Sequence, residues 1–188
     1  MTEQFKLQPM DFLVNVNRGE DAFSIVKRWA VGEYSHIFAY LPLELPIGGG
    51  LVHPFLYESS GRGVVIQSLS NRYGQEVVVV RLKPEFLDRI PLIIEEAIRL
   101  ASDPQARYDY MCIPLNIFPR VFHDKFGMPI PVKYQRNEQM VCSEACAEPC
   151  WRAEVPVLPK GVVPLPGDFV ASRILVRANQ GILSAAWV

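Results

Sequence analysis

The sequence predicts an α+β fold in which helices pack on one side of a mostly antiparallel sheet. Short stretches of alternating or β-branched apolar residues follow one another between residues 11 and 82, which indicates strands joined by tight connections. Segments with helical spacing, residues 21–30 and 84–101, bracket the main run of these strands. This arrangement is typical of folds whose helices are segregated from the sheet, and not of alternating α/β folds.

Length and composition favour one domain spanning residues 1–188 with a sizeable core, because 49% of the residues are hydrophobic. Lys and Arg number 19 and Asp and Glu number 20, a balance that gives no basic footprint for nucleic acid. The first residues contain no apolar signal-peptide region, and no apolar run is long enough to span a bilayer. The cytoplasm is therefore the expected location. The sequence does not indicate the oligomeric state.

The first elements are a strand over residues 11–16, where apolar residues alternate, and a helix over residues 21–30 that ends near Gly32. Four strands are expected next, over residues 36–41, 55–59, 63–69 and 76–82. Residues 42–54 contain three consecutive glycines and are expected to form a mobile loop. Whether this loop gates a site is left open.

Residues 84–101 give the clearest helical pattern, and Pro91 predicts either a kink or two shorter helices. A short helix is expected over residues 117–125. Another is expected over residues 142–151, where Pro149 should bend or end it. The remaining predictions are an extended connector over residues 155–167, a helical turn over residues 168–172, and weak strands over residues 174–176 and 182–188.

Cys142 is the strongest candidate for a catalytic residue. It follows an irregular polar segment and opens a predicted helix, where unpaired N–H groups and the helix dipole stabilise a thiolate. The same N–H groups are suited to hold a developing oxyanion. The alternative reading is a buried cysteine that only packs in the core.

His36 is the candidate general base for this thiol. It lies in an apolar strand, whereas His53 lies in the predicted glycine-rich loop and His123 in a basic segment flanked by prolines. A third polar group usually orients a catalytic histidine, and Glu58 on the following strand is the best candidate. Glu44, in the predicted loop, is a weaker one. The alternative for His36 is a histidine that only packs in the core, and the alternative for Glu58 is an acid that faces solvent.

The order of these residues resembles the circularly permuted papain-like enzymes of the NlpC superfamily, and in particular their YiiX/YebB-like branch. The matching pieces run from Asp11 to Ser172. They are Met10-Asp11-Phe12-Leu13, Ser35-His36, Glu58, Tyr108-Asp109, Cys142-Ser143-Glu144 and Pro166-Gly167-Asp168. The chain departs from the family at Met10, where glycine is common, and in the length of the 42–54 loop.

The resemblance implies a small barrel-like sheet with helices on one side, and a cysteine amidase or peptidase. It implies Cys142 as nucleophile, His36 as general base and Glu58 as the orienting residue. Tyr108 matches a tyrosine that helps to stabilise the oxyanion in the family. The expected substrate is a small peptide or an amino-acid amide, with cell-wall material as one source.

Two other functions stay open on the sequence alone. The same Cys-His pair suits a thioesterase or acyltransferase acting on lipid or thioester substrates, and the fold also suits a catalytically inactive binding module. No cofactor and no metal site is predicted. Cys142, Cys146 and Cys150 recur at intervals of four, but structural zinc normally draws its ligands from two separated loops.

Overall fold

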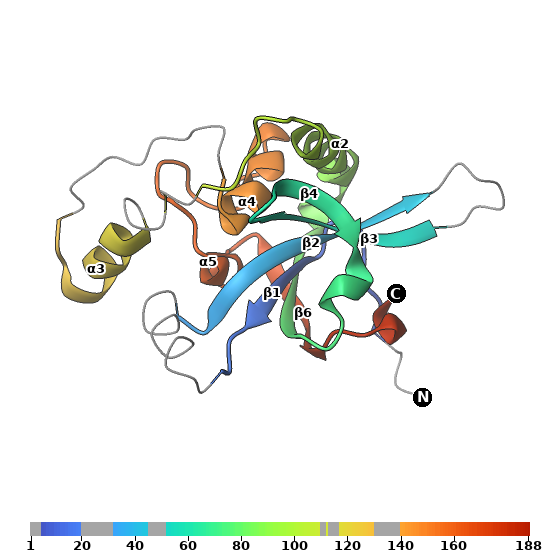
Figure 1. The fold of residues 1–188 in the computed structure, drawn as a ribbon, viewed down its shortest axis with the longest axis horizontal. Coiled ribbons are helices and arrows are strands. Elements are labelled where there is room, and N and C mark those ends of the chain that lie inside the picture. Colours follow the sequence, from blue (N-terminus) through green and yellow to red (C-terminus); the bar gives the residue numbers. More distant parts are fainter. Residues whose placement is uncertain (1–4, 20–31, 45–51, 110–111, 113–116, 130–139) are drawn as a thin grey trace.

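The computed structural model describes residues 5–19, 32–44, 52–109, 112, 117–129 and 140–188. Six strands form one antiparallel sheet in the order β4-β3-β2-β1-β5-β6 (Figure 1). The strands are β1 (Phe12–Val16), β2 (Tyr34–Glu44), β3 (Val52–Ser60), β4 (Gly63–Ser68), β5 (Glu76–Leu82) and β6 (Leu175–Ile182). The α+β class is therefore confirmed.

The sheet is open, whereas the sequence predicted a barrel-like one. β4 and β6 lie at opposite ends of the strand order, and among the described strands they do not pair with each other. β4 pairs with β3 and packs against helix α2 (Ile90–Ala101), so this edge strand meets a helix and not another strand.

The main core lies between the sheet and three helices, α2, α4 (Cys142–Arg152) and α5 (Pro166–Ala171). Figure 1 shows α2 and α4 next to each other above the strands, and the two helices are in contact. Ile37, Ala39 and Leu41 of β2 face this core, while Phe38 and Tyr40 face a smaller cluster on the other side of the sheet. Helix α3 (Phe118–Phe126) lies to one side and packs in a third cluster through Val121.

The loop predicted over residues 42–54 is wrong at both ends, because its first and last residues belong to strands. β2 continues to Glu44 and β3 begins at Val52, with Pro42 opposite Pro54 and Leu43 opposite His53. Two prolines can face each other where a pair of strand residues exchanges no hydrogen bonds, so they do not interrupt the hairpin. The glycines between these strands, and the helix predicted over residues 21–30, lie outside the described residues.

The other predicted elements are largely present. Residues 84–101 form two helices, a 3₁₀ segment η2 (Pro84–Arg89) followed by α2, which is one of the two predicted outcomes. The strand predicted over residues 182–188 is wrong. β6 ends at Ile182, and a 3₁₀ turn η4 (Ala185–Trp187) follows, because its alanines have low β propensity. No helix in the described part of the chain is long and apolar enough to cross a membrane.

Met10 adopts a left-handed backbone conformation, with φ of 60°, in the turn that leads into β1. Its side chain is nonetheless buried in the main core. The neighbouring Asp11 carboxylate is held by both Nε and an Nη of Arg81, each at 2.7 Å, and it accepts the backbone N–H of Gln8. These contacts fix the start of β1 beside β5.

Pro149, which the sequence predicted to bend or end the helix, lies inside α4 and does not end it. Because proline has no N–H, the carbonyl of Ala145 one turn earlier loses its helical partner. The hydroxyl of Tyr57, which is fully buried on β3, donates to this carbonyl at 3.0 Å. A side chain of the sheet thus replaces the missing bond and joins α4 to β3.

We expect Tyr57→Phe to lower the free energy of unfolding by about 1–3 kcal/mol, because a buried carbonyl then lacks a donor. Chemical denaturation measures this change. In a Pro149→Ala background the alanine N–H can bond the Ala145 carbonyl, so the effect of Tyr57→Phe should become smaller. Tyr40→Phe, on the opposite face, is the matched control. Equal losses from Tyr57→Phe in both backgrounds would contradict this role of the hydroxyl.

Candidate active site

Cys142 is the first residue of α4, and its side chain is 8% exposed. The segment around it is tied to the body on two sides. Ser143 donates through Oγ to the carbonyl of Pro164 at 2.6 Å, and Ser59 of β3 donates through Oγ to the carbonyl of Met140 at 2.7 Å. The helix start is therefore held rigidly, as a nucleophile requires.

Glu144 completes the fixation of this helix start. Its Oε2 accepts the backbone N–H of Val141, the residue before the helix, at 3.0 Å. Burial, opposed by the hydrogen bond from the Val141 N–H and assisted by the nearby charge of Asp109, raises the pKa of Glu144 to about 7. Cys112 lies beside these two acids, since its N–H donates to Asp109 at 2.8 Å.

His36 lies on β2 directly after an irregularity in the strand pairing. Asn15 of β1 pairs with His36, but Val16 pairs with Tyr34, so Ser35 is an extra residue in β2. Its hydroxyl donates to the side-chain oxygen of Asn15 at 3.1 Å. A bulge of this kind redirects the side chains next to it, and here it sets the direction of His36.

His36 is hydrogen-bonded to Glu58 on the neighbouring strand, with 2.6 Å between Nε2 and Oε2. The Glu58 side chain is fully buried, whereas that of His36 is 21% exposed. Because Nε2 bonds the carboxylate, Nδ1 is the ring nitrogen left for the thiol of Cys142. The structure thus brings together three residues that the sequence singled out separately.

Two further residues hold Glu58, and sequence reasoning missed both. An Nη atom of Arg72 lies 2.7 Å from each carboxylate oxygen, and Gln67 of β4 donates to Oε1. Arg72 lies on the 3₁₀ turn η1 (Leu69–Arg72), and its guanidinium also stacks over Phe38 at 5.8 Å. Burial acts to raise the pKa of Glu58, but its bonds to His36 and Arg72 outweigh this and lower it.

Cys142 and His36 shift each other's ionisation in opposite directions. Burial alone would raise the pKa of the Cys142 thiol, but the charge of His36, a hydrogen bond to it and the N–H groups of Ile37 and Ser143 lower it below the ordinary value. Burial would lower the pKa of His36, but Cys142 and Glu58 raise it to about 9. Both shifts favour the thiolate–imidazolium pair over the neutral pair.

Tyr108 lies beside the start of α4. It packs against the small cluster that contains Val141, one residue before Cys142. Its predicted contribution to oxyanion stabilisation stays a prediction.

The other candidate residues lie elsewhere. His53 is on β3 and not in a loop, with its ring 4.4 Å from that of Phe55. His123 is on α3, where it pairs with Asp124, and Glu44 is exposed at the end of β2. Burial raises the pKa values of Cys146 and Cys150 on α4, so these thiols stay protonated. Within the described ranges no three His, Cys, Asp or Glu side chains are grouped so that they could hold a metal ion.

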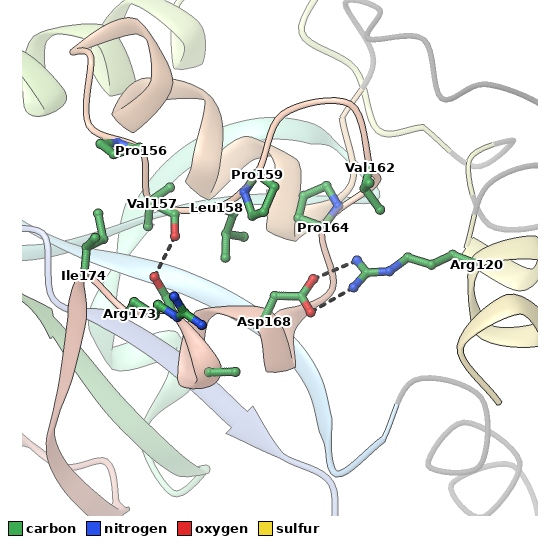
Figure 2. Close-up of a pocket in the computed structure, with 12 residues that line it drawn as sticks. Arg120, Pro156, Val157, Leu158, Pro159, Val162, Pro164, Asp168, Arg173 and Ile174 are labelled. Carbon is green, nitrogen blue, oxygen red and sulfur yellow. Dashed lines mark hydrogen bonds and ion pairs between the residues drawn. The ribbon is translucent and has the colours of Figure 1, made fainter.

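A cavity of about 590 Å³ lies between the 156–164 connector and α5 (Figure 2). Its lining is mostly apolar, and it ends at Arg120 of α3, which forms a two-pronged ion pair with Asp168 at 2.7 and 2.9 Å. Ser172 donates to the carbonyl of Val157 across its floor. Cys142 does not line this cavity, but Pro164, which does, accepts the hydroxyl of the adjacent Ser143.

No protein-family model matches the chain, and no curated protein matches its sequence. Its structure is similar to the crystal structure of the metalloprotein yiiX from Escherichia coli O157:H7, DUF1105, with a TM-score of 0.50 and 15% identity. The match covers 96% of this chain and 100% of the other. At this identity the likeness concerns the fold alone. It supports the predicted YiiX-like resemblance, while membership of the permuted papain-like superfamily stays a prediction.

We expect alkylation of Cys142 by iodoacetamide to follow the thiolate. It should remain fast below the ordinary cysteine pKa and fall as the pH drops through the lowered pKa of Cys142. In His36→Gln the charge that lowers the pKa of Cys142 is removed, so burial raises this pKa. Each pKa unit of that rise reduces the thiolate fraction at pH 7 about tenfold. Mass spectrometry of the labelled cysteines measures the rates, with Cys146 as the internal control. Equal rates in wild type and variant would refute the pairing.

We expect Arg72→Gln to raise the pKa of His36 above about 9, by up to about one unit, because more of the Glu58 charge then acts on the imidazolium. The imidazolium forms below this pKa and is lost as the pH rises through it, so its loss should move to higher pH. An NMR titration of the His36 ring measures the shift. Arg72→Lys keeps the positive charge and should stay close to wild type. An unchanged titration in Arg72→Gln would show that Arg72 only supports the fold.

Proposed function

We propose that this protein is a cysteine-dependent hydrolase that cleaves an amide bond, with Cys142 as nucleophile, His36 as general base and Glu58 as the residue that orients His36. The observation that carries the proposal is the chain of contacts from Cys142 to His36, from His36 to Glu58 at 2.6 Å, and from Glu58 to Arg72 at 2.7 Å. His36 is the proton acceptor for Cys142, Glu58 fixes the orientation of the His36 ring, and Arg72 compensates the charge of Glu58.

In the proposed reaction the Cys142 sulfur attacks the amide carbonyl carbon, and the carbonyl oxygen becomes an oxyanion. We propose that the first N–H groups of α4 bind it. The His36 imidazolium then donates its proton to the amide nitrogen, the C–N bond breaks, and a thioester remains on Cys142. A water molecule then attacks this thioester, and His36 accepts a proton from the water. The C–S bond breaks, the acid is released and the thiolate is restored.

The order of the site residues supports the finer assignment to a permuted papain-like enzyme. His36 and Glu58 come from β2 and β3, and the nucleophile comes later, at the start of α4. The likeness to the YiiX fold agrees with this assignment. We propose a peptide or an amino-acid amide as the substrate, with cell-wall material as one source.

A metal-dependent reaction fits these residues poorly. The similar YiiX structure is described as a metalloprotein. His36 lies between Cys142 and Glu58 and uses its ring nitrogens toward them, so the three do not converge on one point. Among the residues described, no other group of donors is placed to share an ion. The thiolate of Cys142 is therefore the proposed reacting group.

A thioesterase or acyltransferase is the second candidate, because the apolar cavity of about 590 Å³ lies next to the helix that carries Cys142. A cavity lined by Val157, Leu158 and several prolines suits an acyl chain better than a peptide. The same Cys-His pair would then attack a thioester. A catalytically inactive binding module is the remaining possibility.

Hydrolysis of N-acyl peptide amides, measured beside that of acyl thioesters, separates these functions. We expect amide hydrolysis to fall by at least about 10³-fold in Cys142→Ala and to persist in Cys150→Ala, a buried cysteine of the same helix. Hydrolysis of thioesters alone would favour the second candidate. Activity that survives in Cys142→Ala would rule out the proposed nucleophile, and no activity together with slow alkylation of Cys142 would favour the inactive module.

A further inference from the structure

A second cavity, of about 610 Å³, is lined by the turn between β3 and β4 and by the segment that follows α2, and it contains two arginines. Arg62 comes from the turn between β3 and β4, and Arg107 comes from the segment that follows α2. Both side chains are exposed, and neither guanidinium forms an ion pair within the described part of the chain. Asp103 also lines this cavity, but its Oδ1 accepts the backbone N–H of Gln105 at 2.8 Å.

A close backbone contact holds the two arginines next to each other. Val64 donates its N–H to the carbonyl of Ala106 at 2.9 Å. A Cβ placed on Gly63 would lie 2.7 Å from that carbonyl oxygen and 3.3 Å from the Cα of Arg107. Gly63 also has φ of 98°, so no other residue fits this crossing without strain. Arg62 and Arg107, each adjacent in sequence to a member of this contact, are therefore held at fixed backbone positions.

The cavity is connected to the proposed nucleophile through one hydrogen bond. The carbonyl of Arg107 accepts the N–H of Met140 at 2.8 Å, and Met140 is two residues before Cys142. Two residues span at most about 7 Å, so the Arg107 backbone lies within about 10 Å of the backbone of Cys142. Tyr108 also lines the cavity and packs beside Val141. An extended peptide advances about 3.4 Å per residue, so two or three residues cover this distance.

We propose that Arg62 and Arg107 form a carboxylate-binding subsite that recognises the free C-terminus of a peptide substrate, a few residues from the amide bond that is cleaved. Two guanidinium forks that have no ion-pair partner among the described residues match a carboxylate in charge and geometry. This inference rests on the proposed function for its substrate class. It deepens that function, because it selects short peptides with a free carboxylate over internal peptide segments.

Binding without turnover tests the subsite. N-acetyl-trialanine and its C-terminal amide are titrated by NMR into the full-length Cys142→Ser chain at about 0.15 M salt, where long-range attraction is screened. We expect the free carboxylate to bind about tenfold more tightly than the amide. Arg62→Gln and Arg107→Gln should each reduce this preference about threefold, and the double variant should remove it.

Arg173→Gln is the matched control, because Arg173 is an exposed arginine that lines the other cavity. It should leave the preference for the carboxylate unchanged. Equal affinities for the two peptides, or an equal loss of preference in Arg173→Gln, would overturn the subsite. If the preference holds but wild type hydrolyses no amide, the proposed function fails and the binding site stands. If wild type hydrolyses both peptides at the same rate, the subsite inference fails and the function stands.

Discussion

The buried carboxylate of Glu58 is the group on which the arrangement of the site depends. A fully buried ionised acid is unfavourable unless several donors satisfy it, and here three side chains do so. They come from consecutive elements: His36 from β2, Gln67 from β4 and Arg72 from η1, while Glu58 itself is on β3. One charge therefore fixes the relative positions of four neighbouring segments, and the imidazole ring is oriented as part of the same network.

The start of α4 is fixed by a second set of contacts, which joins the first set through Ser59 of β3 and at Cys142. Ser59 binds the carbonyl of Met140, two residues before Cys142, and Ser143 binds the carbonyl of Pro164, while Glu144 binds the N–H of Val141. Because the sheet and the helix are each rigid on their own, the Cys142–His36 contact needs little further ordering. The fold supplies the geometry before any substrate is bound.

The sequence predicted the α+β class and most strands because their periodicity is local. It also placed Cys142, His36 and Glu58 in a plausible order, and the structure brings them together. The Arg72 contact could not be predicted, because an isolated arginine in a turn follows no spacing rule and reaches Glu58 only through the register of β3 and β4. The bulge at Ser35 was missed for the same reason, since one extra residue leaves no mark in an apolar pattern.

Met10 combines an unfavourable backbone conformation with a well-packed side chain. A left-handed conformation costs a residue other than glycine about 1–2 kcal/mol, and burying a methionine side chain contributes about 1.5–3 kcal/mol. The conformational cost and the burial free energy nearly cancel. Burial slightly outweighs the cost because Met10 is only 1% exposed. Glycine and methionine are thus two near-equivalent solutions for the turn before β1. A methionine at this position, where the sequence resemblance led us to expect glycine, therefore reflects the packing of the local core.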